Sequence, residues 1–537
     1  MGKSRIMDIL AQIIRGKSEE ENNSPSDIET LDLLHYDVPE GYIEVERTWL
    51  KKPYALASIL FNEAENEYYY HLAEPKLTPF EKALLEKTYD DLRDVLVLEG
   101  EVAPDEKEKV LEHHAKELLN GYSIEINPES LEKILYYLKR NCIGIGKIDA
   151  LMEDEFIEDI SCDGVNVPIF LYHKRYQNIK TNLSFAEDEL DSFVIVLAQK
   201  CGKHLSIAEP MLDATMQDGS RLQITLGRDI TTRGSSFTIR RFASHPFTPV
   251  DLLRHQTFTK EMLAYLWLCI ESNRSLLFAG GTAAGKTSAL NAVSIFIPPN
   301  AKIISIEDTR ELTLYHDNWI ADVTRESTLS GGARKIDMYE LLRHALRQRP
   351  EYLLVGEVRG REAHTLFQAM STGHTTYSTI HASTIEEVVN RLRNEPINVP
   401  LMMLQALDIL SIQRLLYIEK GERVRRCDVI AEFAGIDPAT NNIKINELYR
   451  FNSATNSFEK VSDSIVLAKI QNQRGWSTAE LEEDLNRRAK LLDYMLKKDM
   501  WDYKEISMLI HRYFYNPEMI MGLIEEEIGD EEDEPDR

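Results

Sequence analysis

Eight residues, GGTAAGKT from Gly280 to Thr287, match the phosphate-binding pattern GxxxxGK[ST] in full. An apolar stretch, 275–280, precedes them, and a helical pattern, 286–296, follows. This order predicts a strand, a glycine-rich loop and a helix whose N-terminus attracts phosphate. Lys286 would then reach the β- and γ-phosphates of a nucleotide, and Thr287 would hold Mg²⁺. The predicted nucleotide-binding residues are Gly280, Gly281, Thr282, Ala283, Ala284, Gly285, Lys286, Thr287 and Ser288.

Two acidic segments follow this loop along the chain. The apolar stretch YLLVGEV (352–358) ends near Glu357, and such a carboxylate can lie beside a nucleotide-bound Mg²⁺. The alternative is a buried strand that ends in a solvated acid. The segment IEDTRE (306–311) carries three acids at the end of a predicted strand, which suits a site that polarises water. Glu311 and Glu307 are both candidates for that role, and an ordinary acidic loop is the alternative.

Two histidines and three arginines complete the candidate set. His374 and His381 are seven residues apart around a predicted strand, 375–382, so they would lie on opposite faces and would not share one metal. One could sense a γ-phosphate while the other meets a neighbouring element. Arg240 and Arg241 end a predicted strand outside the phosphate-binding region, and Arg221 precedes them. Exposed arginines are usually solvated, but charge that develops on a γ-phosphate needs a cation, which another domain or subunit can supply.

The elements that must hold these residues form an α/β pattern. From about residue 250, apolar strands alternate with amphipathic helices, as in a parallel sheet covered by helices. We divide the chain into a flexible segment 1–30, a variable α/β region 31–125, an α+β lobe 126–245, a P-loop lobe 246–437, a strand and helix extension 438–523, and an acidic disordered tail 524–537. We predict an interdomain hinge at residues 245–258. Ser477 with Glu480 predicts a capping box at the start of a helix in the extension.

Composition excludes several classes of protein. The 537 residues carry a formal charge of -27, so nucleic acid is not expected as the main partner. Nine acids and one Arg lie within 525–537. The longest apolar run, Met262 to Ile270, is too short for a membrane-spanning helix, which needs about 20 residues. The five cysteines are far apart and form no CxxC pair, which indicates reduced thiols and no zinc site.

Taken together, these segments resemble the type II/type IV secretion ATPases, which power pilus assembly, type II secretion and the archaellum. That family carries a Walker A box, an Asp box, a Walker B box that ends in Glu and a His box. Here they read GGTAAGKT, SIEDTREL, LLVGEVRG and STGHTTYSTIHA, in the same order. The resemblance covers about 130 to 437. The stretches 157–173, 324–332 and 477–520 look most like the archaeal branch.

The resemblance implies a RecA-like P-loop NTPase C-terminal lobe, a smaller α+β N-terminal lobe and helical extensions at both ends. It implies a cytoplasmic homohexamer at the inner face of the membrane that uses ATP and Mg²⁺ and acts on an integral-membrane platform protein. Hydrolysis would open and close the lobes and drive a pilus-like filament, an archaellum or protein export.

The same resemblance implies a role for each candidate residue. Glu311, or Glu307 in its place, would polarise water, and Glu357 would coordinate Mg²⁺ or position the water. The arginine fingers carry over to Arg240 and Arg241, and also to Arg221, and the His-box residues carry over to His374 and His381. The Asp box reads EDTRE where bacterial members commonly read EDPIE, and the zinc motif of some bacterial members is absent. The alternative from another class is a hexameric RecA-like nucleic-acid translocase or helicase.

Overall fold

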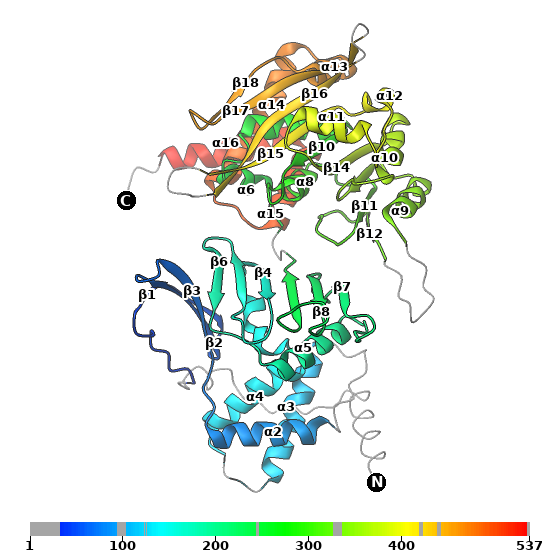
Figure 1. Cartoon of the computed structure of the whole chain (residues 1–537). Helices are drawn as coiled ribbons and strands as arrows, with labels where there is room; N and C mark the ends of the chain where they lie inside the picture. Colours follow the sequence, from blue (N-terminus) through cyan, green and yellow to red (C-terminus); the bar gives the residue numbers. More distant parts are fainter. Residues whose placement is uncertain are drawn as a thin grey trace, which may run out of the picture. The chain divides into compact units, whose positions relative to one another are not determined.

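A computed structural model describes residues 33–93, 104–122, 124, 126–242, 246–325, 336–417, 423–437 and 442–533. The chain forms two compact units, Met1–Ala243 and Ser244–Arg537 (Figure 1). The border between them falls one residue before the predicted hinge at 245–258. The predicted flexible segment 1–30 and most of the stretch 324–332 lie outside the described residues.

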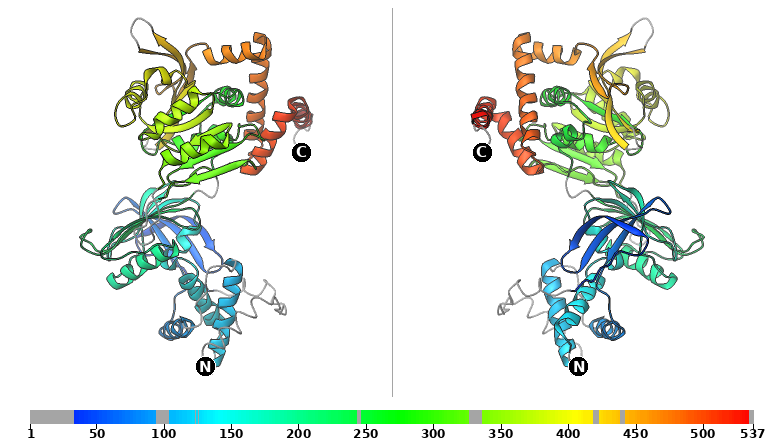
Figure 2. Two further views of the ribbon diagram at one scale, coloured as in Figure 1. Left: turned by 90° about the vertical axis from the view of Figure 1, so that its right-hand side faces the viewer. Right: turned by 90° about the vertical axis from the view of Figure 1, so that its left-hand side faces the viewer.

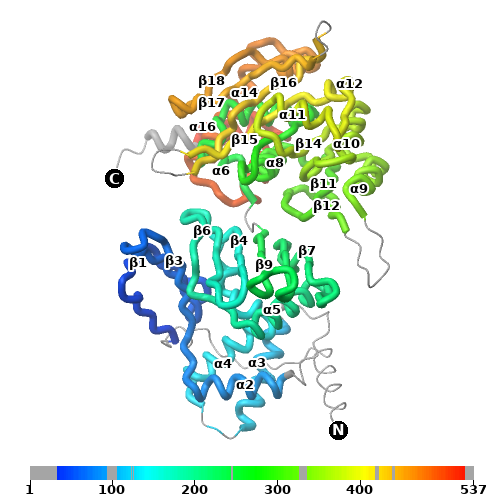
Figure 3. The backbone as a smooth tube through the Cα atoms, viewed as in Figure 1, coloured from blue at the N-terminus to red at the C-terminus, as the bar shows by residue number. Residues whose placement is uncertain are grey.

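The N-terminal unit is built on one nine-stranded sheet in the order β1-β2-β3-β6-β5-β4-β9-β8-β7 (Figure 3). Its strands are β1 (Tyr42–Lys51), β2 (Ala55–Asn62), β3 (Glu67–Ala73), β4 (Ile157–Cys162), β5 (Phe170–His173), β6 (Gln177–Thr181), β7 (Met211–Thr215), β8 (Arg221–Thr225) and β9 (Ser236–Arg240). A short parallel pairing of β3 with β6 joins the two halves of the sheet. The boundary proposed between 125 and 126 therefore does not divide the structure. Because β3 and β6 are more than a hundred residues apart in the chain, their pairing leaves no local signal in the sequence.

Among the described residues of this unit, four helices and two short 3₁₀ turns accompany the sheet. They are α2 (Pro79–Arg93), α3 (Pro104–Gly121), α4 (Pro128–Cys142), η2 (Gly146–Ile148), η3 (Ala150–Glu153) and α5 (Glu187–Lys200). Helices α2, α3 and α4 share a small apolar cluster of their own, whereas α5 packs on the core of the sheet. Strand β5 begins only at Phe170, although the alternating apolar pattern starts at Val165. Pro168, which has no N–H to donate to a ladder, lies just before it.

The C-terminal unit is built on a second nine-stranded sheet, in the order β12-β11-β13-β14-β10-β15-β16-β17-β18. Its strands are β10 (Leu276–Gly280), β11 (Ile303–Glu307), β12 (Trp319–Val323), β13 (Tyr352–Val355), β14 (Thr375–His381), β15 (Ile409–Tyr417), β16 (Arg423–Asp437), β17 (Asn442–Asn452) and β18 (Ser457–Lys460). The first six strands in this order are parallel, and the last three pairings are antiparallel. The predicted boundary at 437/438 falls inside the β16–β17 hairpin, so the sheet extends to Lys460 and the helical extension begins after it.

Alternate residues of the central strands face two separate cores. Leu276 and Phe278 of β10 belong to one apolar cluster, and Leu277 and Ala279 belong to the other. A strand that is buried on both faces reads as a continuous apolar run, which is why the sequence predicted these strands. The helices of this unit are α6 (Pro249–Arg254), α7 (Lys260–Glu271), α8 (Lys286–Ser294), α9 (Met338–Ala345), α10 (Glu362–Ser371), α11 (Ile385–Arg393) and α12 (Leu401–Leu404), with a 3₁₀ turn η4 (Leu346–Gln348).

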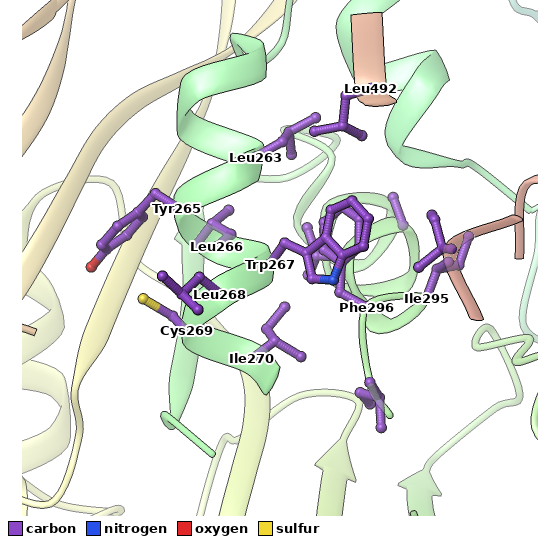
Figure 4. Close-up of a cluster of buried hydrophobic side chains, with 14 of the residues drawn as sticks. Leu263, Tyr265, Leu266, Trp267, Leu268, Cys269, Ile270, Ile295, Phe296 and Leu492 are labelled. Carbon is purple, nitrogen blue, oxygen red and sulfur yellow. The ribbon is translucent and has the colours of Figure 1, made fainter. Parts of the chain in front are cut away.

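In the described part of the chain, the C-terminal extension consists of four helices, drawn in orange and red in Figure 2, of which α13 and α14 pack on α7. They are α13 (Ile465–Arg474), α14 (Thr478–Lys497), α15 (Tyr503–Tyr515) and α16 (Pro517–Asp533). The predicted capping box of Ser477 and Glu480 is confirmed at the start of α14. Trp267 of α7 stacks on Phe296 with ring centroids 4.8 Å apart, inside the core drawn in Figure 4.

A buried ion network ties α14 to α7. The Arg488 side chain is 3% exposed, and it bonds Asp484 and Glu271 at 2.7 Å each. Its guanidinium also lies 5.0 Å from the centre of the Trp267 ring. Because a buried charge is tolerated only when it is paired, this network holds the extension firmly on the P-loop lobe.

The predicted disordered tail from 524 is partly wrong, since α16 continues to Asp533. Ile520, Met521 and Ile524 are buried in the main core and anchor this helix despite its acidic end. Within the described ranges, no helix is both long and apolar enough to cross a membrane.

Candidate nucleotide site

The phosphate-binding loop connects β10 to α8, as the sequence predicted. Gly280 and Gly285 have φ of 155° and 88°, a region that side chains rarely adopt. A Cβ on Gly280 would also lie 2.5 Å from the carbonyl oxygen of Gln413. The loop can therefore turn tightly enough to point its N–H groups inward, where α8 begins at Lys286.

A chain of contacts joins the P-loop lysine to the acid after β13. The side chain of Lys286 is buried, and its Nζ donates to the carbonyl of Gly281 at 2.9 Å. The same Nζ lies 3.4 Å from His381 Nδ1, and His381 Nε2 lies 3.3 Å from Glu357 Oε1. Burial, and then the Lys286 ammonium, lower the pKa of His381, so its imidazole is neutral at pH 7. Because Lys286 can only donate, the imidazole proton belongs on Nε2, facing Glu357.

Glu357 lies two residues beyond the end of β13 and faces into the site. Arg359 donates to its Oε2, whereas Oε1 is buried, lies 3.3 Å from His381 Nε2 and makes no well-aligned hydrogen bond within the described residues. The strand order supports this placement, because β14 alone separates β13 from β10. The carboxyl ends of these parallel strands meet at one edge of the sheet, where ligands of α/β proteins bind.

The two acids of the Asp box differ sharply in environment. Glu307, the last residue of β11, is 2% exposed, and burial raises its pKa to about 7. Its Oε1 accepts from the backbone N–H groups of Glu311 and Leu312 at 2.9 and 3.0 Å. The side chain of Glu311 is exposed on the turn that these bonds hold. Glu307 therefore shapes the turn, and Glu311 is the acid that can meet a water molecule.

We expect Glu307→Gln to stabilise the protein at high pH. The folded state binds the Glu307 proton more tightly than the unfolded state, so wild-type stability falls as pH rises from about 4.5 to about 7. The whole shift corresponds to roughly 3 kcal/mol, and a neutral amide would remove it. Urea titrations between pH 5 and 8.5, followed by tryptophan fluorescence, measure the difference; four of the five tryptophans lie in the C-terminal unit. Glu311→Gln is the control, and parallel profiles for wild type and Glu307→Gln would contradict the assignment.

The two histidines lie at opposite ends of β14. His381 ends the strand beside Lys286, whereas His374 precedes its first residue, at the opposite edge of the sheet. His374 Nδ1 lies 3.3 Å from the hydroxyl of Thr372. The structure therefore brings His381 to the nucleotide site of its own lobe and leaves His374 away from it.

The three arginines have two different environments within the N-terminal unit. Arg221 of β8 and Arg240 of β9 are both exposed and are paired directly across the ladder. Like charges at opposite positions repel, although Asp159 of β4, opposite Arg240 on its other side, offsets part of this charge. The Arg241 guanidinium instead donates to the backbone carbonyls of Met152, Asp154 and Ile157. These bonds favour Arg221 and Arg240 over Arg241 as ligands of an external anion.

One residue beside the loop, Arg425, carries no signal in the sequence. Arg425 of β16 donates from Nε to the carbonyl of Ala283 at 3.0 Å, and its Cδ lies 3.2 Å from where a Cβ on Gly285 would be. The β15–β16 register, which pairs Leu415 with Arg425, carries it to the loop. No local pattern marks this arginine, because 140 residues separate it from the glycines.

The site also has the donor set that a nucleotide-bound Mg²⁺ uses. Thr287 lies at the start of α8, and Glu357 Oε1 is a buried oxygen that makes no well-aligned hydrogen bond in the described part of the chain, with His381 Nε2 3.3 Å away. Mg²⁺ beside phosphates takes one or two protein oxygens and keeps several waters. These two side chains fit that requirement.

The fold and the site together define a P-loop nucleotide-binding lobe of the RecA-like class. Residues 194–459 match the family described as type II/IV secretion system protein. Residues 2–76 match the PilB3-like N-terminal domain, and residues 454–534 match the PilB3-like C-terminal domain.

Three relatives place the chain in a family. Uncharacterized protein MJ0900 of Methanocaldococcus jannaschii is 36% identical over 396 residues, 73% of this chain and 71% of that protein. Uncharacterized protein MJ1287 of the same organism is 46% identical over 267 residues, 48% of this chain and 98% of that protein. Type IV secretion system protein PtlH of Bordetella pertussis is 30% identical over 226 residues, 38% of this chain and 67% of that protein. The chain belongs to the type II/IV secretion system protein family.

Proposed function

We propose that the protein is an ATP-hydrolysing motor that drives assembly of a pilus-like filament or an archaellum, or type II-like protein export. The observation that carries the proposal is the contact chain from Lys286 through His381 to Glu357 beside a complete phosphate-binding loop. The PilB3-like matches at both ends of the chain support the filament branch. We propose that the motor is a cytoplasmic homohexamer that acts on an integral-membrane platform protein.

Each group at the site has a distinct proposed role in hydrolysis. The N–H groups of the loop and Lys286 bind the β- and γ-phosphates. Thr287 and Glu357 would hold Mg²⁺, which would neutralise phosphate charge. Glu311 accepts a proton from the attacking water while the bond between the γ-phosphorus and the bridging oxygen breaks. The His381 ring lies between Glu357 and Lys286, so it can report whether a γ-phosphate has drawn the lysine away.

The motor proposal can be tested in cells that carry a chromosomal Lys286→Ala allele. We expect pilin-like subunits, or exported proteins, to remain in the membrane or the cell while the variant is present at wild-type levels. Lys444→Ala, at an exposed position on β17, is the matched control. Normal surface filaments and normal export in the Lys286→Ala strain would refute the proposal.

Purified protein provides a second test. DNA should leave the ATPase rate of this protein unchanged, whereas the ATPase rate of a nucleic-acid translocase would rise.

We further propose that Arg221 and Arg240 complete the site of a neighbouring subunit. Double substitution to Ala should lower turnover by about 10³ with a much smaller change in ATP affinity, because a guanidinium mainly meets charge that develops in the transition state. Turnover should also rise more than linearly with protein concentration as rings form.

A mixing experiment tests whether these arginines act between subunits. Lys286→Ala chains have intact arginines, and Arg221→Ala/Arg240→Ala chains have an intact loop, so activity should reappear when the two inactive proteins are combined. Arg241→Ala should lower stability instead, because it removes the guanidinium from three backbone carbonyls, of which that of Asp154 keeps a further donor, the N–H of Ile157. No recovery in hexamers of confirmed mass would exclude action between subunits.

A further inference from the structure

The loop that follows Glu311 is in contact with the C-terminal extension. The Tyr503 hydroxyl, on the first residue of α15, donates to the carbonyl oxygen of Thr313 at 2.7 Å. Burial raises the pKa of Tyr503, so the hydroxyl keeps its proton and remains a donor. Tyr503 thus contacts a residue 190 positions earlier in the chain. That residue, Thr313, lies two positions after Glu311, the acid proposed to activate water.

The backbone from Glu311 to Thr313 is held at every N–H. Glu307 binds the amides of Glu311 and Leu312, and Asn291 Oδ1 accepts from the amide of Thr313 at 2.9 Å. Asn291 belongs to α8, the helix that begins with the P-loop lysine. The N–H of Thr313 binds Asn291, and its carbonyl oxygen accepts from Tyr503. The backbone of Thr313 therefore connects the nucleotide helix α8 to the C-terminal extension.

Further contacts brace the same loop against α15. His511 of α15 lies 4.9 Å from His316, ring centre to ring centre, and His316 Nε2 lies 3.0 Å from the carbonyl of Ile297. Leu312 and Leu314 are buried in the same apolar cluster as residues of α15. The loop is therefore packed as well as hydrogen-bonded.

Tyr503 itself is fixed in place from the other side. Asp502 caps α15 by accepting from the amide of Glu505 at 2.8 Å. Arg254 of α6 donates to Asp499 at 2.8 Å and to the carbonyl of Met500 at 3.2 Å, in the turn before α15. The start of α15 is thus held to the lobe independently of Thr313, as a support for a catalytic group must be.

We infer that Tyr503 is a positioning residue for Glu311, and that α15 of the C-terminal extension is part of the hydrolytic apparatus. The inference rests on the proposed function, in which Glu311 polarises the attacking water. A displacement of about 1 Å at a catalytic group can lower a rate by about 10². A ligand or partner that shifts α15 would thereby change the rate of hydrolysis without touching the nucleotide.

The test compares two Tyr→Phe variants on one helix. Tyr503→Phe removes the bond to Thr313, whereas Tyr513→Phe removes a buried hydroxyl that makes no hydrogen bond within the described residues. With the full chain and Mg-ATP, we expect Tyr503→Phe to lower kcat about tenfold, with KM for ATP within about twofold of wild type. Tyr513→Phe should keep wild-type kcat, and both variants should keep the wild-type melting temperature within a few degrees. Equal kcat for the two variants would overturn the inference.

A double variant shows whether Tyr503→Phe lowers the rate of hydrolysis through Glu311 or independently of it. In the Glu311→Gln background, adding Tyr503→Phe should cause no further loss, and an undiminished tenfold loss would overturn the inference. If Glu311→Gln alone has wild-type activity, the proposed role of Glu311 fails instead. Hydrogen exchange then still tests the contact, because the amides of Leu312 and Thr313 should exchange faster in Tyr503→Phe than in Tyr513→Phe. Equal exchange would show that Tyr503 does not hold the loop.

Discussion

Lys286→Ala will bind ATP roughly 10- to 100-fold more weakly than wild type, the loss expected for one or more charge-assisted hydrogen bonds. Its turnover will fall below detection. The ammonium of the buried Lys286 side chain neutralises phosphate charge, and truncation leaves only backbone donors there. Fluorescent-nucleotide titration measures the affinity, and phosphate release measures turnover.

The control for this variant is Lys444→Ala, which removes an exposed lysine from β17 of the same unit. It should retain wild-type affinity and turnover. Wild-type turnover in purified Lys286→Ala protein would mean that nucleotide is hydrolysed elsewhere, and the assignment of the loop would be wrong.

Glu311→Gln will keep ATP bound and will hydrolyse it about 10²- to 10⁴-fold more slowly, the range expected when a general base is removed. The amide preserves the shape of the side chain, and the turn stays in place because Glu307 holds it through the backbone. Rapid mixing with Mg-ATP followed by acid quenching measures the rate for bound nucleotide.

Two neighbouring acids provide the comparison. Asp308→Asn alters an exposed acid next to Glu307 and should have little effect on the rate of hydrolysis. Glu307→Gln should affect the rate less than Glu311→Gln, because a neutral acceptor can still bind the two amides. If instead Glu307→Gln stops hydrolysis and Glu311→Gln does not, the roles of the two acids are reversed.

The sequence predicted those features that depend on short stretches of chain. The P-loop was visible because its glycines, lysine and flanking strand and helix are contiguous. Glu357 was visible because a strand buried on both faces reads as an apolar run with a clear end. The capping box at Ser477 is likewise a four-residue signal.

The features that were missed depend on contacts between distant segments. Arg241 resembles Arg240 in sequence, yet only the fold shows that its donors are taken by carbonyls of the 152–157 segment. Arg425 and Tyr503 reach the site from β16 and α15, so no spacing could reveal them. The choice between Glu307 and Glu311 likewise depends on burial, because both belong to the same acidic run, 306–311.

The identity of the nucleotide that stays bound after mixing shows most directly whether ATP is hydrolysed at the Gly280–Thr287 loop. Purified full-length wild type, Glu311→Gln and Lys286→Ala are each mixed with Mg-ATP, separated rapidly from free nucleotide, quenched with acid and analysed by chromatography. Hydrolysis at the Gly280–Thr287 loop predicts mainly ADP on wild type, ATP on Glu311→Gln and little nucleotide on Lys286→Ala. Unchanged ATP on the wild-type protein, or equal ADP on all three proteins, would contradict it.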